Sequence, residues 1–253
     1  MTATLAPWTD GRFRLQAEEA VTPPDPAKFA AYAQIAAPQS GSAPRPDYGW
    51  RYALRFEQGL PGGVKLGAEA AAWRLASVTE LGPMGSGEAP VSAGPATRQQ
   101  LAFNMAAPLD PLGLRRTTVT GEVNVRRSQV LDPFTQQPRP LSGEAPYGAT
   151  LRLAGALPAS AISWNVTARA EGPESLDQMA QVTNLGATAG LGGGLVYGAG
   201  PVKVSLEIDN LLGGSRDVTS LSYAGSRIDD QIDAVTRRRD ISRAVRIALR
   251  RGL

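Results

Sequence analysis

The side chains available for catalysis in this chain are limited, because its 253 residues include no histidine and no cysteine. Ser-His-Asp and Cys-His arrangements, histidine-based zinc sites and disulfides are therefore excluded. Carboxylates remain, and Glu18–Glu19 and Asp229–Asp230 are adjacent pairs. Because neighbours in a strand face opposite ways, we interpret both pairs as ordinary solvated charges. We expect no enzyme activity, no catalytic residues, no cofactor and no metal.

The charge pattern gives no sign of nucleic-acid binding. The formal net charge is +3, and the arginines are spread along the chain, with one tight run at 237–239 beside Asp240. A nucleic-acid site would combine a basic face with aromatic side chains for stacking. The first residues lack both the basic start and the apolar run of a secretion signal, and no stretch approaches about 18 unbroken apolar residues.

Alternation between apolar and charged residues predicts the elements that hold these side chains. In 202–209, VKVSLEID, the apolar residues fall on one side of an extended chain and the charged or polar ones on the other. We predict an all-β chain with one short helix, 25–36, capped by Asp25 and with Pro26 in its first turn. About ten strands are expected: 11–18, 51–57, 64–70, 100–106, 118–126, 149–155, 162–169, 184–191, 202–209 and 244–250.

Short and long connections alternate along the chain, which is typical of an up-and-down transmembrane β-barrel. An even strand count places the C-terminus on the side of the short turns. The expected short turns are 60–63, 108–113, 157–160 and 197–201. The expected long connections, rich in Gly, Pro, Ser and charge, are 23–46, 82–97, 128–145, 172–181 and 213–238.

In a barrel one face of each strand meets lipid and the other faces the interior, or lumen. A soluble β-sandwich or solenoid shares the alternation, and the aromatic girdle expected of a barrel is thin: Trp50, Tyr52, Trp73, Trp164 and Tyr197. The residues expected to face the lumen are Arg51, Arg55, Glu57, Glu122, Asn124, Asn165, Arg169, Lys203, Glu207 and Asp209. Those expected to face lipid are Tyr52, Leu54, Phe56, Val119, Val123, Val125, Ile162, Trp164, Val166, Val202, Val204, Leu206, Ile208, Val245, Ile247 and Leu249.

Three segments, taken in order, resemble the C-terminal barrel of alphaproteobacterial TonB-dependent outer-membrane receptors. The first, 128–146, reads SQVLDPFTQQPRPLSGEAP and is similar to a strand that ends in D-P-x-T followed by R-x-L/I-S. The second, 206–227, reads LEIDNLLGGSRDVTSLSYAGSR and is similar to a penultimate strand with D-N-L and a later Y-x-G-x-R. The third, RAVRIALRRGL, resembles the last barrel strand.

The resemblance covers at least 97–253 and implies that residues 1–253 are the C-terminal part of a 22-stranded barrel, a size whose lumen is plugged. The plug domain and the TonB-contacting box have no counterpart here, although family members usually have both and usually end on an aromatic residue, where this chain has Leu253.

The implied function is TonB-driven uptake of a scarce nutrient, such as a siderophore, a vitamin or a carbohydrate, across the outer membrane of a Gram-negative cell. The implied partners are the lipid bilayer, the missing plug and barrel strands, the TonB complex through the missing part, and a small-molecule ligand at the extracellular loops. A self-sufficient small barrel, acting as a pore or structural protein, and a soluble all-β binding module are the alternatives.

Overall fold

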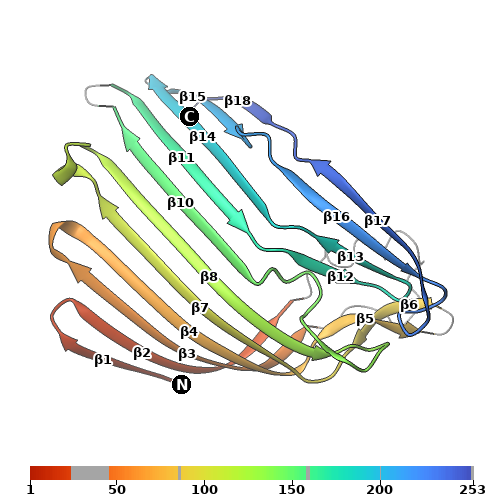
Figure 1. The fold of residues 1–253 in the computed structure, drawn as a ribbon. Coiled ribbons are helices and arrows are strands. Elements are labelled where there is room, and N and C mark those ends of the chain that lie inside the picture. Colours follow the sequence, from red (N-terminus) through yellow and green to blue (C-terminus); the bar gives the residue numbers. More distant parts are fainter. Residues whose placement is uncertain (24–45, 85–86, 158–159, 200, 252–253) are drawn as a thin grey trace.

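The computed structural model describes residues 1–23, 46–84, 87–157, 160–199 and 201–251. The expected helix at 25–36 lies outside these ranges. Within them the chain is all-β and every strand pairing is antiparallel. The strands lie side by side in one broad curved sheet, with two smaller sheets at one end of it (Figure 1).

The largest sheet has 12 strands, and all but one follow each other as a meander in which consecutive strands of the sheet are neighbours. β9 (Pro138–Arg139) pairs only with β8. The meander runs in the order β1 (Thr2–Trp8), β2 (Gly11–Thr22), β3 (Asp47–Leu60), β4 (Val64–Ser77), β7 (Ala96–Pro108), β8 (Thr117–Leu131), β10 (Tyr147–Ala156), β11 (Ile162–Glu171), β14 (Thr188–Ala199), β15 (Val202–Asp209) and β18 (Ala244–Arg251).

Nine of the ten expected strands fall within single strands of this meander, while the tenth, 184–191, was placed wrongly. The backbone breaks there at Gly186, whose N–H donates to the carbonyl of Asp217 at 2.7 Å, so the segment divides between β13 (Gln181–Leu185) and β14. The meander also contains β1, which the sequence did not predict. The expectation of about ten strands therefore falls one short of the eleven strands of the meander.

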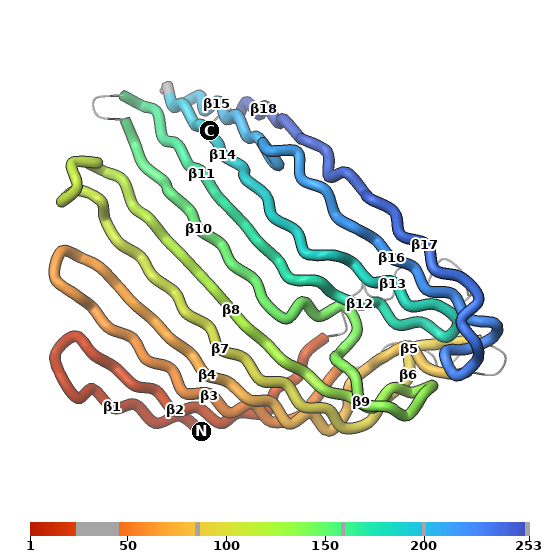
Figure 2. The backbone as a smooth tube through the Cα atoms, in the orientation of Figure 1, coloured from red at the N-terminus to blue at the C-terminus, as the bar shows by residue number. Residues whose placement is uncertain are grey.

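The long connections were predicted as loops, but 82–97, 172–181 and 213–238 are strand for half or more of their length, while 128–145 is mostly outside strands. The connection 23–46 lies almost entirely outside the described residues. β5 (Thr79–Met84) and β6 (Gly87–Ser92) form a two-stranded sheet. β12 (Glu174–Asp177), β13, β16 (Ser215–Tyr223) and β17 (Gln231–Asp240) form a four-stranded sheet in that order. These four strands continue β11, β14, β15 and β18 beyond the 12-stranded sheet, which we call the principal sheet (Figure 2).

All tight turns lie at one end of the principal sheet and all long connections at the other (Figure 1). Short 3₁₀ turns at Pro61–Gly63 and Asp110–Leu112 join β3 to β4 and β7 to β8. Since Arg251 pairs with Val202, β18 ends at the short-turn end, where the sequence placed the C-terminus. β1 and β18 are the two edges of the sheet, and no pairing among the described residues joins them, so the sheet is open.

The only buried apolar cluster in the described part of the chain lies at the long-connection end. It contains Leu75, Val78, Ala96, Val130 and Leu141. Leu141 belongs to the connection between β8 and β10 and is anchored by its N–H, which donates to the hydroxyl of Ser128 at 3.1 Å. Elsewhere the principal sheet is a single layer, so most of its side chains have no second layer of this chain to pack against.

Candidate functional site

The strand register separates the side chains of the principal sheet into two faces, because residues paired across antiparallel strands point to the same side. Leu54 pairs with Leu15 and Ala70, Ala70 pairs with Leu101, and Leu101 with Val125. Following these pairings from β1 to β18 puts all sixteen residues expected to face lipid on one side, which we call the apolar face. All ten expected to face the lumen are on the other, the polar face.

The apolar face is uncovered. Val123, at its centre, is 47% exposed, and Ile247, near its edge, is 73% exposed. Leucine, valine and aromatic side chains on β2, β3, β7, β8, β10 and β14 are exposed to a similar degree. Soluble monomers rarely expose so large a continuous apolar surface.

Aromatic side chains lie toward both ends of the apolar face. Trp50 and Tyr52 stack with ring centroids 6.5 Å apart near the long-connection end of β3. Trp164 and Tyr197 lie near the short-turn ends of β11 and β14. The fifth residue of the expected girdle, Trp73, is on the polar face instead, since it pairs with Arg51, and the guanidinium of Arg51 stands 5.4 Å from its ring centroid.

Several charges of the polar face are paired with one another. Arg51 bridges Glu18 at 3.1 Å and Glu69 at 2.5 Å, and the side chain of Glu18 is 41% exposed. Arg55 and Glu57 form a pair at 3.0 Å, and Glu207 pairs with Arg246 at 3.4 Å.

A hollow of about 1070 Å³ opens on the polar face over β8, β10, β11, β14, β15 and β18. Its floor is low because Gly190, Gly192 and Gly194 of β14 carry no side chain on this face. Arg51, Arg55, Glu57 and Lys203 share the face but lie outside the hollow. It brings together six of the ten residues expected to face the lumen: Glu122, Asn124, Asn165, Arg169, Glu207 and Asp209.

A buried ion-pair cluster closes the long-connection end, and sequence reasoning did not single it out as a site. Arg139 contacts Asp132 at 2.5 Å, Glu80 at 3.0 Å and Asp177 at 3.5 Å. Arg227 contacts Asp132 at 2.6 Å and Asp177 at 3.7 Å. The side chains of Glu80 and Asp132 are 0% and 1% exposed. These five residues, the ion-pair cluster, join β5, the connection after β8, β9, β12 and the connection after β16.

The surroundings of Asp132 stabilise its charged form. Burial acts to raise the pKa of this carboxyl, but the N–H of Thr135 and the guanidinium groups of Arg139 and Arg227 outweigh burial and lower the pKa to about 2. The pKa of Arg139 is raised: burial opposes its charge, but the carboxylates of Glu80 and Asp177 more than compensate.

The lowered pKa makes the cluster acid-resistant. A carboxyl whose pKa is lower in the folded than in the unfolded state stabilises the fold above its unfolded pKa of about 3.9, and this contribution is lost as the pH falls toward 2. We expect pepsin to cleave beside Phe134 slowly at pH 4 and rapidly near pH 1.5, as followed by mass spectrometry. A free peptide of residues 130–140 controls for the pH dependence of pepsin itself, and identical acceleration in both would contradict the prediction.

Three members of the cluster lay within the motifs quoted above. Asp132 begins D-P-x-T, where it accepts hydrogen bonds from the N–H groups of Phe134 and Thr135 at 2.8 and 2.9 Å. Arg139 begins R-x-L-S, and Arg227 ends Y-x-G-x-R. Glu80 and Asp177 carried no sequence signal.

Asn210, of the D-N-L motif, holds the junction between the two larger sheets. Its backbone is left-handed, with φ of 51°. Its side chain accepts a hydrogen bond from the N–H of Gly214 at 3.0 Å and donates one to the carbonyl of Ile241 at 2.5 Å. Asparagine tolerates this conformation better than most residues, which gives the motif a structural reason.

The described residues contain no helix long and apolar enough to cross a membrane. Nor do they contain a group of three or more acidic side chains arranged to hold a metal ion. The three carboxylates of the ion-pair cluster are occupied instead by the two arginines.

The chain matches no family model, and no curated protein matches its sequence.

Proposed function

We propose that this chain is the C-terminal portion of the β-barrel of a TonB-dependent outer-membrane receptor that takes up a scarce nutrient. We base the proposal on one observation: most of the large apolar strand residues of the meander share a face that nothing in the described chain covers. A closed barrel in lipid gives such a face its partner, because hydrocarbon is the environment in which exposed valine and leucine are favoured.

Two other features support placement in a bilayer. The strands of the meander are mostly 10 to 15 residues long, enough to cross a bilayer with tilt. At the long-connection end the apolar face carries the polar side chains Arg74, Gln99 and Arg127, which lie beside Trp50 and Tyr52. Tryptophan and tyrosine are the side chains that membrane interfaces favour.

Features of the polar face support a water-filled or plugged interior. The ion pairs Arg55–Glu57 and Glu207–Arg246 are partly exposed, and the 1070 Å³ hollow leaves room for a plug or a ligand. The connections that carry the ion-pair cluster fold onto the polar-face side, where Leu141 packs against Val130. In a transporter these connections would form the outer mouth, where the ligand first binds.

A membrane-inserted and a soluble chain behave differently when refolded from denaturant. We expect the full chain to aggregate in detergent-free buffer and to acquire strand circular dichroism and protease resistance when phospholipid vesicles are added. A monomeric, folded chain in detergent-free buffer would instead identify a soluble all-β module and overturn the proposal.

The open sheet favours a barrel portion over the self-sufficient small barrel, because closed single-chain barrels of this kind have even strand numbers and no free edges. The reading frame upstream of the Met1 codon tests this choice. A plug domain and further strands encoded there would support a portion of a receptor. A secretion signal directly before Met1 would indicate a complete small barrel.

A further inference from the structure

We propose that the hollow on the polar face binds a short zwitterionic peptide of two or three residues. Because it names the class of nutrient that is taken up, this inference rests on the proposed function. The described lining contains four arginines and four carboxylates, so the hollow has no net charge. Such a surface does not attract a ligand by net charge, but a neutral ligand with separated charges can pair with both kinds of side chain.

The anionic end of the ligand is assigned to two arginines on neighbouring strands. Arg169 of β11 pairs with Thr150 of β10, and in the next row of this face Arg152 of β10 pairs with a threonine of β11. The Cα atoms of the two arginines are therefore about 8 Å apart. Neither arginine side chain has an ion-pair or hydrogen-bond partner in the part of the chain that the structure describes. Two guanidinium groups beside threonine hydroxyls can bind one carboxylate through charge-assisted hydrogen bonds.

The cationic end is assigned to Asp209, on the far side of β14 from the arginines. Its Oδ1 lies 3.5 Å from the point that a Cβ on Gly192 would occupy, so the carboxylate lies beside the glycine backbone. The Asp209 side chain has no partner among the described residues, whereas Glu207 pairs with Arg246.

The lining also indicates which kind of cation fits. Quaternary ammonium ions are recognised by aromatic side chains, and none of the described residues that line the hollow is aromatic. A carboxylate without aromatic neighbours suits a primary ammonium group, which can donate hydrogen bonds to it. The amino terminus of a peptide is such a group.

The space between the two ends is open because β14 has glycine there. Gly190 pairs with Arg169, and a Cβ built on Gly190 would meet no atom within 4 Å. A glycine inside a strand can mark a place where another backbone approaches closely. Thr167 and Asn165 line the adjacent stretch of β11, and their side chains make no hydrogen bond within the described residues. Both can donate to carbonyl oxygens, so the middle of the ligand is assigned peptide groups.

The separation of the two ends sets the length of the ligand. Arg169 and Asp209 are two strands and one two-residue step apart, so their Cα atoms are about 12 Å apart. A hydrogen bond of about 3 Å at each end leaves about 6 Å in the plane of the sheet, and more above the side-chain ends. An extended chain of two residues spans about 7 Å and one of three about 10 Å. A single amino acid is too short to reach both ends.

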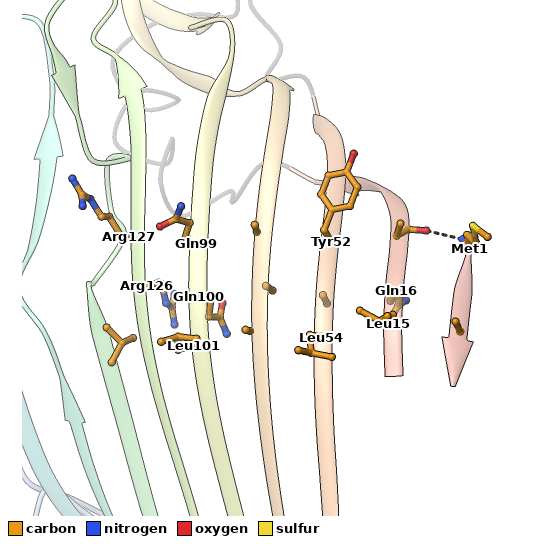
Figure 3. A pocket seen from close by; sticks show the side chains of 17 residues that line it. Met1, Leu15, Gln16, Tyr52, Leu54, Gln99, Gln100, Leu101, Arg126 and Arg127 are labelled. Atoms are coloured by element: carbon orange, nitrogen blue, oxygen red, sulfur yellow. Dashed lines mark hydrogen bonds between the residues drawn. The ribbon is translucent and has the colours of Figure 1, made fainter. Parts of the chain in front are cut away.

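A second depression, on the apolar face, lacks this arrangement of charges. It has a volume of about 850 Å³ and crosses β1 to β8, with Leu15, Leu54 and Leu101 in one row across it (Figure 3). None of the described residues that line it is acidic, so it offers no carboxylate to an ammonium group. The peptide site is therefore assigned to the polar face.

The test measures peptide binding to the full chain refolded in detergent micelles, by equilibrium dialysis against isotope-labelled trialanine with unlabelled competitors. N-acetyl-trialanine and trialanine amide each lack one terminal charge and should bind about tenfold more weakly than trialanine. Free alanine should bind more weakly still.

Charge variants identify which side chains hold which terminus. Arg152→Gln with Arg169→Gln should abolish the discrimination against the amide and keep that against the acetylated peptide. Asp209→Asn should do the reverse. Arg12→Gln with Arg14→Gln, on the polar face of β2 and outside the hollow, should keep both.

A second pair of variants tests the open space over β14. Gly190→Leu meets no neighbouring atom at its Cβ but fills this space, and it should weaken trialanine binding at least tenfold. Gly198→Leu, on the same face of the same strand but outside the hollow, should leave binding unchanged.

The outcomes separate this site from the proposed function. Equal binding of all four compounds by a micelle-inserted chain would overturn the peptide site and leave the membrane location standing, as would discrimination that survives both charge variants. A chain that is folded and monomeric without detergent, and that binds trialanine with the expected discrimination, would keep the site and overturn the receptor.

Discussion

Replacing Val123 with arginine is expected to remove about 2 to 4 kcal/mol from the free energy of unfolding measured in a phospholipid bilayer. Val123 lies on the apolar face between Phe103 and Ala149 and is 47% exposed. If hydrocarbon covers it, the guanidinium must be taken out of water or the bilayer must thin around it. Either event costs free energy that the native valine does not require.

The adjacent residue supplies the matched control. Asn124→Arg makes a similar change one position along the same strand, on the polar face inside the 1070 Å³ hollow. There the new charge remains hydrated, so the expected loss is below about 1 kcal/mol. Denaturant titration in vesicles, followed by tryptophan fluorescence, measures both variants. Equal losses for the two would mean that the faces do not differ in environment and that lipid does not cover Val123.

The second large effect is expected at the ion-pair cluster. Asp132→Ala should cost about 3 to 5 kcal/mol, because it leaves Arg139 and Arg227 largely buried without the carboxylate that both contact. It also removes the acceptor for the N–H groups of Phe134 and Thr135. Asp132→Asn, which keeps an acceptor oxygen but no charge, should give an intermediate loss.

An exposed ion pair is the control for this variant. Glu207→Ala breaks the pair with Arg246, whose side chains are 53% and 75% exposed, and should cost less than about 1 kcal/mol. Hydrogen exchange at the amides of Phe134 and Thr135, read together with global unfolding, separates local opening from loss of the whole fold. If Asp132→Ala behaved like Glu207→Ala on both measures, the cluster would not stabilise this end of the sheet.

The meander was predictable because its strands alternate apolar and charged residues at the period that a pleated strand imposes. The expected strand 202–209 coincides with β15, and the face assigned to each of its residues follows directly from the register. The alternation of short and long connections correctly predicted that the tight turns share one end of the sheet. Short 3₁₀ turns join two of the strand pairs at that end.

The strands of the long connections could not be predicted, because they carry no apolar alternation. SRDVTSLSY in β16 and QIDAVTRRRD in β17 are polar on both faces and read as loop, yet they extend hairpins whose pairing is already set by β15 and β18. β1 was missed because TATLAPW is short and contains a proline, which an edge strand tolerates. In these strands tertiary context overrides local preference.

The candidate site also has a part that the sequence predicts and a part that it does not. The strand periodicity of the sequence predicts the two faces. The ion-pair cluster instead depends on partners far apart in sequence, such as Glu80 and Arg139, which are 59 residues apart. A single sequence gives no signal for such pairs. The glycines of β14 also weaken its strand propensity, so their contribution to the hollow emerged only from the register.

The ion-pair cluster also has a consequence for the order in which the chain folds. Hairpins of the meander need only local contacts, and they can form as soon as both strands exist. The cluster needs Glu80 from the first half of the chain and Arg227 from its last hairpin. Asp132, Asp177 and Glu80 without both arginines would be carboxylates withdrawn from water without sufficient countercharge, which is strongly unfavourable. We therefore expect the long-connection end to stay hydrated until β17 arrives, and to be the last part of the molecule to become ordered.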